Sequence, residues 1–285
     1  MNLVCRYWRQ AAIGAKELEL WAYIAMIAVP DSEPEKHGEG AQAKRENRAQ
    51  FVGLERERSG MAVSDFEMMR VLGKGCASKV LLARHKVTSN LFALKVTARK
   101  RVSAEQEVQY TSTEQAVLRR MVAEGNPFVV MLRRSFHDRD HLFLVTDFHP
   151  GGELATQISR WGRLGRNRAR FYAAEIVEGI EGLHKNGVIH RDLKPENVLI
   201  GSDGHVVLAG FGLSKEFPCQ SNPATVPPNG IPGAEMETTS TFRGTAEYIA
   251  PEVIQGFPYN FEIDWWSFGT MLYEMLAGIV WTLDF

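Results

Sequence analysis

Two glycines, Gly73 and Gly75, lie between two stretches with strand character, and Val80 stands at the start of the second stretch. Glycines in such a turn let backbone N–H groups approach a polyphosphate closely, which a β-carbon would obstruct. Glycine pairs are also common in ordinary hairpin turns. The stretch taken alone therefore leaves two interpretations open, a phosphate-binding loop and a structural turn.

A lysine among apolar residues is the second chemical candidate. Lys95 ends the apolar run 92–95, for which a strand is expected. A buried ammonium group needs a partner, and Glu114 offers one on the core-facing side of a following helical stretch. Such a pair can bind the α- and β-phosphates of ATP. A purely structural ion pair would give the same pattern.

The residues around these candidates predict a strand-rich unit with one helix. Short apolar runs separated by glycine-rich or polar turns indicate strands at 66–72, 80–84, 91–96, 131–136 and 142–146. A helical stretch between the third and fourth strands carries one apolar face, made by Val117, Leu118, Met121 and Val122.

Beyond Gly151 and Gly152 the spacing of apolar residues becomes helical. A long buried helix is predicted from the helical spacing of four residues, Tyr172, Ile176, Ile180 and Leu183. Short strands are expected at 198–200 and 206–208, and a last helix at 262–277. The segment 216–236 contains five prolines and almost no periodicity, so a mobile loop is expected there.

These patterns predict an α+β protein of two lobes, with a β-rich N-lobe at 66–148 and a helical C-lobe at 149–285. Residues 1–64 mix charges of both signs with few large apolar residues beyond position 29, so they are expected to be a flexible extension. The longest apolar stretch, 21–29, is too short to span a membrane.

Composition excludes some classes of function. The formal net charge is −1, so no global field favours nucleic acid or an anionic membrane, although a local basic groove is compatible with it. The cysteines Cys5, Cys76 and Cys219 show neither zinc-binding spacing nor a disulfide framework. An intracellular, cytoplasmic location is expected because its reducing conditions suit such cysteines.

Residues 188–200 resemble the catalytic loop of eukaryotic protein kinases without a departure. The resemblance implies that Asp192 orients and deprotonates the substrate hydroxyl, that Lys194 steadies the phosphoryl group, and that Asn197 ligates magnesium. It also implies a bilobal kinase fold over 66–285, with ATP and Mg²⁺ as cofactors. The implied ATP-binding residues are Gly73, Gly75, Val80, Lys95, Glu114, Glu153 and Asn197.

Residues 239–252 resemble the activation loop of the AGC group of serine/threonine kinases. Within that group, the chain resembles the fungal Akt-like and ribosomal-protein-kinase-like members. Thr245 is typical of serine/threonine rather than tyrosine kinases. The resemblance implies that an upstream kinase phosphorylates Thr241 and that the phosphate pairs with Arg191. An exposed threonine without a regulatory role is the alternative.

Three glutamates stand where related kinases bind the basic residues of a protein substrate. These residues, Glu153, Glu196 and Glu274, together with Thr245, are the implied substrate-binding set. The resemblance therefore implies phosphorylation of serine or threonine near basic residues, although each glutamate taken singly could equally be a solvated surface residue.

Three features depart from the family pattern. Gly210 replaces the metal-binding aspartate before Phe211 and Gly212, and glycine cannot ligate magnesium. Ser78 stands where a third loop glycine is usual, and Arg243 where the group usually has cysteine. Removal of a metal ligand predicts a thousandfold or greater loss of transfer, on the order of several kcal/mol.

The family continues through three further helices beyond the position of Phe285, which implies a truncated C-lobe or a shortened gene model. Loss of their cover would expose apolar residues of the last predicted helix, namely Trp265, Trp266, Met271, Leu272 and Leu276.

The predicted function is an ATP-dependent serine/threonine kinase. The alternatives are a pseudokinase that acts as a nucleotide- or protein-binding scaffold and a fragment without independent function.

Overall fold

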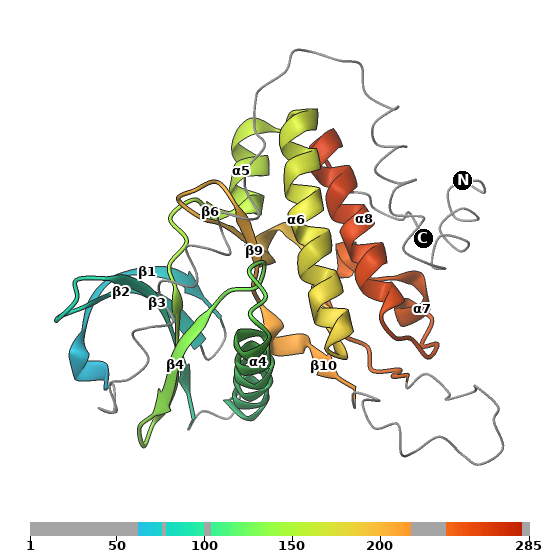
Figure 1. Ribbon diagram of the computed structural model, residues 1–285. Helices are drawn as coiled ribbons and strands as arrows, with labels where there is room; N and C mark the ends of the chain where they lie inside the picture. The colour runs from blue at the N-terminus through green and yellow to red at the C-terminus, as the bar shows by residue number, and fades with distance from the viewer. Residues whose placement is uncertain (1–61, 76–77, 100–103, 218–237, 281–285) are drawn as a thin grey trace, which may run out of the picture.

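The computed structural model describes residues 62–75, 78–99, 104–217 and 238–280 of the 285-residue chain. The predictions for residues 1–61, for the proline-rich segment 218–237 and for the three cysteines lie outside these ranges. The described part contains a β-rich lobe and a helical lobe (Figure 1), as the sequence predicts.

The smaller lobe is built on one antiparallel sheet with the strand order β1-β2-β3-β5-β4. All five strands expected from the apolar runs are present, with bounds within two residues of those predicted. They are β1 Phe66–Lys74, β2 Ser78–His85, β3 Leu91–Ala98, β4 Leu132–His137 and β5 His141–Asp147. A short 3₁₀ helix, η2 Val63–Asp65, precedes them.

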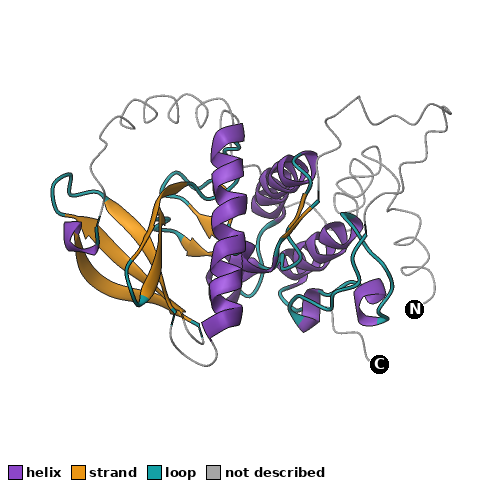
Figure 2. Cartoon of the chain, turned by 90° about the horizontal axis from the view of Figure 1, so that it is seen from below, coloured by secondary structure: helices purple, strands orange, loops and turns teal. Residues whose placement is uncertain are grey.

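The predicted helix of this lobe is α4, Ala104–Glu124. Its apolar face is fully buried at Val117, Leu118 and Met121. Figure 2 shows α4 between the sheet and the helices of the larger lobe, and α4 contacts β3, β4 and the 3₁₀ helix η4, Phe211–Leu213. The helix is therefore in contact with elements from both lobes.

The larger lobe contains the two long helices that the spacing predicts, α6 Arg166–Lys185 and α8 Glu262–Ala277. The predicted strands β8 Val198–Ile200 and β9 Val206–Leu208 pair with each other and with β6 Gly152–Glu153. Elements that the sequence did not indicate are short. They are α5 Leu154–Trp161, α7 Pro251–Ile254, β7 Val188–Ile189, β10 Lys215–Glu216, η3 Pro195–Asn197 and η6 Ala246–Tyr248.

One hydrophobic core crosses from the small lobe into the large one. It joins Val117 and Met121 of α4 to Ile176 and Ile180 of α6. Backbone hydrogen bonds reinforce the junction, because the N–H of Leu208 donates to the carbonyl of Phe128 at 2.8 Å. The sheet has a separate small core of its own, with Phe66, Leu94 and Val145 among its members.

The expectation of lost cover on α8 is wrong for Met271, which is fully buried in the shared core. Trp265, Leu272 and Leu276 are half-buried and pack against the same core, while Trp266 packs against a second cluster around Tyr259. Helix α6 and the segment 246–248 supply these contacts. Within the described ranges, no helix combines the length and apolar character that crossing a bilayer requires.

Candidate active site

The loop that carries Asp192 is held by a buried carboxylate. The two-residue strand β7 leads into it, and the next two backbone N–H groups, those of His190 and Arg191, donate to the side chain of Asp264 at 2.8 and 2.9 Å. His184 forms a third hydrogen bond to Asp264, at 2.8 Å. Arg191 adopts a left-handed conformation with φ of 66°, and these hydrogen bonds compensate the strain of that turn.

Burial by itself would raise the pKa of Asp264. The hydrogen bond and charge of His184, together with the backbone N–H and side chain of His190, outweigh burial and hold the pKa below its usual value. The Asp264 carboxylate therefore remains charged and keeps the loop that carries Asp192 in place. Asp264 has a role that the sequence did not indicate, although a carboxylate inside an otherwise apolar helix is the signal that could have identified it.

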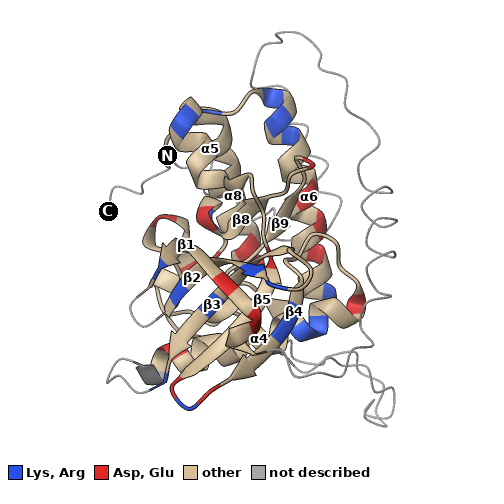
Figure 3. Cartoon of the chain, turned by 90° about the vertical axis from the view of Figure 1, so that its left-hand side faces the viewer, with Lys and Arg blue, Asp and Glu red and all other residues tan. Residues whose placement is uncertain are grey.

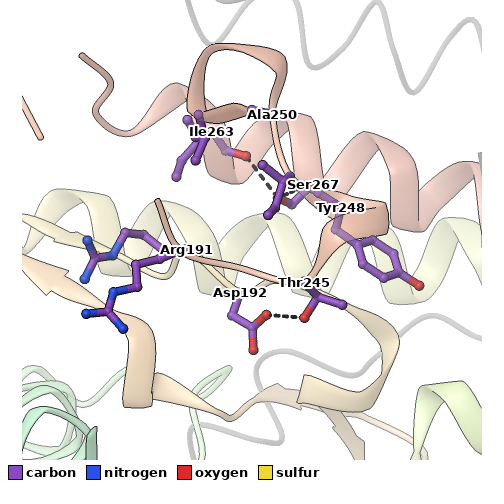
Figure 4. A pocket seen from close by; sticks show the side chains of 10 residues that line it. Arg191, Asp192, Thr245, Tyr248, Ala250, Ile263 and Ser267 are labelled. Atoms are coloured by element: carbon purple, nitrogen blue, oxygen red, sulfur yellow. Dashed lines mark hydrogen bonds between the residues drawn. The ribbon is translucent and has the colours of Figure 1, made fainter. Parts of the chain in front are cut away.

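Two side chains donate to the carboxylate of Asp192, and a third, Lys194, forms an ion pair with it. The Thr245 hydroxyl donates to Oδ1 at 2.6 Å, and Figure 4 shows this contact beside a hollow of the large lobe. Lys194 Nζ lies 3.1 Å from Oδ2 and also donates to the Thr245 hydroxyl at 2.6 Å. Asn197 Nδ2 donates to Oδ2 at 3.1 Å and to the Asp192 carbonyl at 2.7 Å.

The structure thus brings four predicted site residues, Asp192, Lys194, Asn197 and Thr245, into one hydrogen-bonded group. A carboxylate oriented by several donors is arranged to accept a proton from a hydroxyl presented to it. The Lys194 ammonium beside it supplies positive charge for a transferring phosphoryl group.

The predicted ion pair between β3 and α4 is present. Lys95 Nζ donates to Glu114 Oε2 at 2.6 Å, and both side chains are largely buried. Burial alone would lower the pKa of Lys95, but the charge and hydrogen bond of Glu114, with a further contribution from Glu107, outweigh it and raise the pKa. The ammonium therefore stays protonated and suited to bind phosphate oxygens.

The glycine-containing turn follows β1 and precedes β2. Val80 pairs with Gly73 on one side and with Lys95 on the other. The N–H of Gly75 donates to the Ser78 carbonyl at 2.8 Å. A β-carbon at position 75 would lie 2.8 Å from the Ser78 hydroxyl, so a larger residue there requires that hydroxyl to move.

Gly210 lies directly against Asn197. Its φ is +79°, and a β-carbon there would come within 2.3 Å of Asn197 Oδ1. The Asn197 side chain thus occupies the space that a larger residue at 210 would need, and it is turned to donate to Asp192. Among the described residues, no group of three histidine, cysteine, aspartate or glutamate side chains is arranged to hold a metal ion.

The residues of the site are better suited to bind ATP than to bind Mg²⁺. Lys95, held by Glu114, is suited to the phosphates of ATP, whereas the side-chain oxygen of Asn197 is the ligand available for Mg²⁺ beside Asp192. Magnesium prefers oxygen ligands and retains several waters, so an amide oxygen with substrate phosphates is compatible with weak binding.

The three predicted substrate-binding glutamates influence one another electrostatically. Burial and the negative charge of Glu196 raise the pKa of Glu153. Burial also raises the pKa of Glu274, which the charge of Glu196 raises further while the hydrogen bond from Tyr248 opposes the rise. The Tyr248 hydroxyl donates to Glu274 Oε2 at 2.6 Å. A carboxylate whose pKa is raised by a neighbouring negative charge gains from a bound positive charge nearby.

Thr241 is exposed, as its predicted role as a phosphate acceptor requires. Its hydroxyl lies 3.2 Å from that of Thr239, and its carbonyl accepts a hydrogen bond from Tyr259 at 2.6 Å. Arg191 meanwhile donates to the carbonyls of Leu213 and Ser214 at 2.6 and 3.1 Å. The pairing of Arg191 with a phosphate on Thr241 therefore remains a prediction.

Arg243 makes a contact that the sequence did not indicate. Its guanidinium donates to the Tyr110 hydroxyl and lies 5.5 Å from the centre of the Tyr110 ring. Tyr110 is on α4, one helical turn before Glu114. The contact therefore connects the segment after Thr241 to the helix that holds Lys95.

Comparison with known proteins agrees with this geometry. Residues 66–282 match the family described as "Protein kinase domain". The chain is 41% identical over 219 residues to "RAC family serine/threonine-protein kinase homolog" of Dictyostelium discoideum, covering 77% of this chain and 46% of the relative. It is 44% identical over 216 residues to "Serine/threonine-protein kinase Sgk1" of Danio rerio, covering 76% and 46%.

A third relative, "Protein kinase C zeta type" of Oryctolagus cuniculus, is 40% identical over 220 residues, covering 77% of this chain and 34% of the relative. The chain thus spans about half the length, or less, of these curated relatives. The family match covers most of the chain and includes both the Asp192 group and the Lys95–Glu114 pair. This chain belongs to the protein kinase family, in its AGC group of serine/threonine kinases.

Proposed function

We propose that the chain transfers the γ-phosphate of ATP to serine or threonine hydroxyls of protein substrates. The observation that carries the proposal is the hydrogen-bonded group around Asp192, assembled in the same molecule as the Lys95–Glu114 pair. Membership of the serine/threonine kinase family supports the same activity.

Each residue has a defined part in the proposed reaction. Lys95 binds the phosphates of ATP, below the turn that contains Gly73 and Gly75. Asp192 accepts the proton of the substrate hydroxyl as the hydroxyl oxygen attacks the γ-phosphorus, and Lys194 stabilises the charge on the phosphoryl oxygens. Magnesium, when bound through Asn197, would neutralise charge on the ATP phosphates.

The proposed substrates carry arginine or lysine near the acceptor hydroxyl. Glu153 and Glu274 support this proposal because each has a pKa raised in part by the charge of Glu196. A guanidinium bound among the three would relieve that repulsion. We also propose a cytoplasmic location, an upstream kinase acting on Thr241, and no nucleic-acid substrate.

Transfer of labelled γ-phosphate from Mg-ATP to an arginine-containing serine/threonine peptide tests the proposal, with Asp192→Asn as the matched control. Transfer by the unmodified chain, reduced by about a hundredfold or more in the Asp192→Asn protein, is the expected result. Equal background from both folded proteins would refute the proposed activity.

One observation favours a second function, a pseudokinase that binds nucleotide without transferring phosphate. Gly210 supplies no metal ligand, and Asn197 lies where a β-carbon at 210 would be. Titration with ATP in EDTA and in excess Mg²⁺ separates the two functions. Equal affinity in both conditions, without transfer, would support the scaffold, whereas tighter binding and transfer with Mg²⁺ would support the enzyme.

A further inference from the structure

The end of α5 and the start of α6 form an arginine-rich surface. The 21 residues between Glu153 and Glu175 include five arginines and no acidic residue. Figure 3 shows these basic residues gathered at the neighbouring ends of α5 and α6. The concentration is local, because the chain as a whole has a net charge of −1.

Four of these arginines, Arg160, Arg163, Arg168 and Arg170, are exposed to solvent. None of the four forms a salt bridge with a carboxylate of the described residues. With Trp161 they form a surface that we call the arginine tip. Its positive charge is therefore not neutralised by the part of the chain that the structure describes.

The backbone under the arginine tip is firmly anchored. Leu164 is 3% exposed, and its N–H donates to the Met275 carbonyl of α8 at 2.7 Å. The loop also packs tightly against the end of α8, since a β-carbon on Gly278 would lie 1.9 Å from the Gly162 carbonyl oxygen. Arg163 is thus displayed from a fixed loop between the two helices that carry the other three arginines, which lowers the entropy lost on binding.

Arg168 does not stabilise the helix on which it lies. It stands in the first turn of α6, which contains no acidic residue, and the N-cap, Gly165, provides no side-chain cap. The helix macrodipole disfavours positive charge in this first turn. A negatively charged partner would turn this local cost into a favourable interaction.

Trp161 adds an apolar element to the arginine tip. Its side chain is 62% exposed, although its indole N–H donates to Gln157 at 3.3 Å. A solvent-exposed indole ring whose N–H group is hydrogen-bonded is typical of tryptophans that lie at the membrane–water interface. The planar guanidinium groups of arginine can likewise form paired hydrogen bonds with the phosphate groups of lipid headgroups.

We propose that the arginine tip binds the surface of a membrane containing acidic phospholipids. The combination of four unpaired arginines with one exposed tryptophan on the adjoining ends of two helices suits a broad anionic surface that also accepts an aromatic ring. The tip lies at the opposite end of α5 from Glu153. The proposal does not depend on the activity proposed above.

Co-sedimentation with vesicles tests this proposal, using phosphatidylcholine alone and with about one third phosphatidylserine. The unmodified chain is expected to bind the acidic vesicles, and Arg160→Gln with Arg168→Gln is expected to weaken binding at least about tenfold. The matched control is Arg70→Gln with Arg139→Gln, which removes the same charge from two exposed arginines of the small lobe. This control is expected to bind within about twofold of the unmodified chain.

Fluorescence quenching by brominated phosphatidylcholine in the same acidic vesicles tests the position of Trp161. Quenching is expected in the unmodified chain and should be largely lost in Trp161→Phe, while the Phe variant still binds. Equal weakening by the two double variants, or quenching unchanged in Trp161→Phe, would overturn the proposal. Binding to a single-stranded RNA oligonucleotide through the same arginines, without binding to vesicles, would identify nucleic acid as the partner instead.

Discussion

Asp192 accepts hydrogen bonds from Thr245 and Asn197 and forms an ion pair with Lys194, and the position of Asn197 depends on its neighbour Gly210. With no side chain at 210, the asparagine fills the vacated space and directs its amide nitrogen to Asp192. Asn197, the proposed magnesium ligand, thus also holds the carboxylate of Asp192. At the residue scale, the balance between these two uses determines how well the site can hold magnesium.

The substitution Gly210→Asp tests this balance. It supplies a carboxylate ligand but requires Asn197 to move, because the new β-carbon would lie 2.3 Å from Asn197 Oδ1. Magnesium-dependent peptide phosphorylation is expected to rise by about a hundredfold or more. Gly210→Ala is the control, since it adds the same β-carbon without a ligand and should give no gain. If a folded, ATP-binding Gly210→Asp protein showed no rise in peptide phosphorylation, the missing metal ligand would not be what limits transfer.

Replacement of Asp264 by asparagine tests the anchor of the catalytic loop. The variant should lose about 2–4 kcal/mol of unfolding free energy, because one carboxylate oxygen is replaced by an NH₂ group that cannot accept hydrogen bonds from the buried groups facing it. The folded-state pKa of Asp264 is lowered, so its stabilisation is present above the unfolded pKa of about 3.9 and is lost as pH falls through the folded pKa. Urea unfolding across acidic pH should therefore show the difference from the unmodified chain shrinking as pH falls.

The raised pKa values of Glu153 and Glu274 predict a pH-dependent substrate preference. As pH falls, both carboxylates become protonated at a higher pH than ordinary glutamates, whose pKa is about 4.3. The advantage of an arginine-containing peptide over its alanine analogue should decline over that range. The ratio of the two kcat/KM values as a function of pH measures the effect. A flat ratio would argue against binding of the basic residue by these glutamates.

At the scale of the elements, α4 connects the two parts of the candidate site. Its Glu114 holds Lys95, its Tyr110 receives Arg243, and its Arg120 lies 3.4 Å from Glu216 of β10. The position of α4 therefore depends on the segment that follows Thr241. Nucleotide binding and the conformation of that segment should be coupled through this helix.

Arg243→Ala should weaken ATP binding by about fivefold, because loss of the Tyr110 contact lets α4 move away from Lys95. Arg119→Ala, on an exposed arginine of α4 that contacts Ser135 instead, should leave ATP affinity unchanged. In a Glu114→Gln background the effect of Arg243→Ala should disappear. An undiminished effect in that background would mean that Arg243 acts by some other route.

At the scale of the whole molecule, the shared core makes the two lobes one cooperative unit. Met121 of α4 is buried in the same cluster as Ile176 and Leu208 of the larger lobe. Met121→Ala should lower the unfolding free energy by about 2–5 kcal/mol. Hydrogen exchange in α6 should accelerate together with exchange in α4, whereas Val87→Ala, at an 86% exposed position, should change neither. Faster exchange confined to α4 would show that the lobes unfold independently.

Much of the fold was predictable because it is encoded locally. The five strands of the sheet, the helix face at Val117 and Met121, and the bounds of α8 follow from the spacing of apolar residues. Short elements such as β6, β7 and α5 were not predicted, because two to eight residues carry too little periodicity. The strands β6 and β7 form where their backbone groups meet partners that are distant in sequence.

The sequence by itself determined the family, the Asp192 loop, and the pairing of Lys95 with Glu114, because residue types at fixed spacings define them. Only the tertiary structure decided that Asn197 fills the space beside Gly210 and that Arg243 reaches Tyr110 across 133 positions. It also decided which charges are compensated, leaving the arginines of the tip unpaired among the described residues while Asp264 is fully satisfied. These outcomes depend on contacts between residues far apart in the chain, which no local pattern encodes.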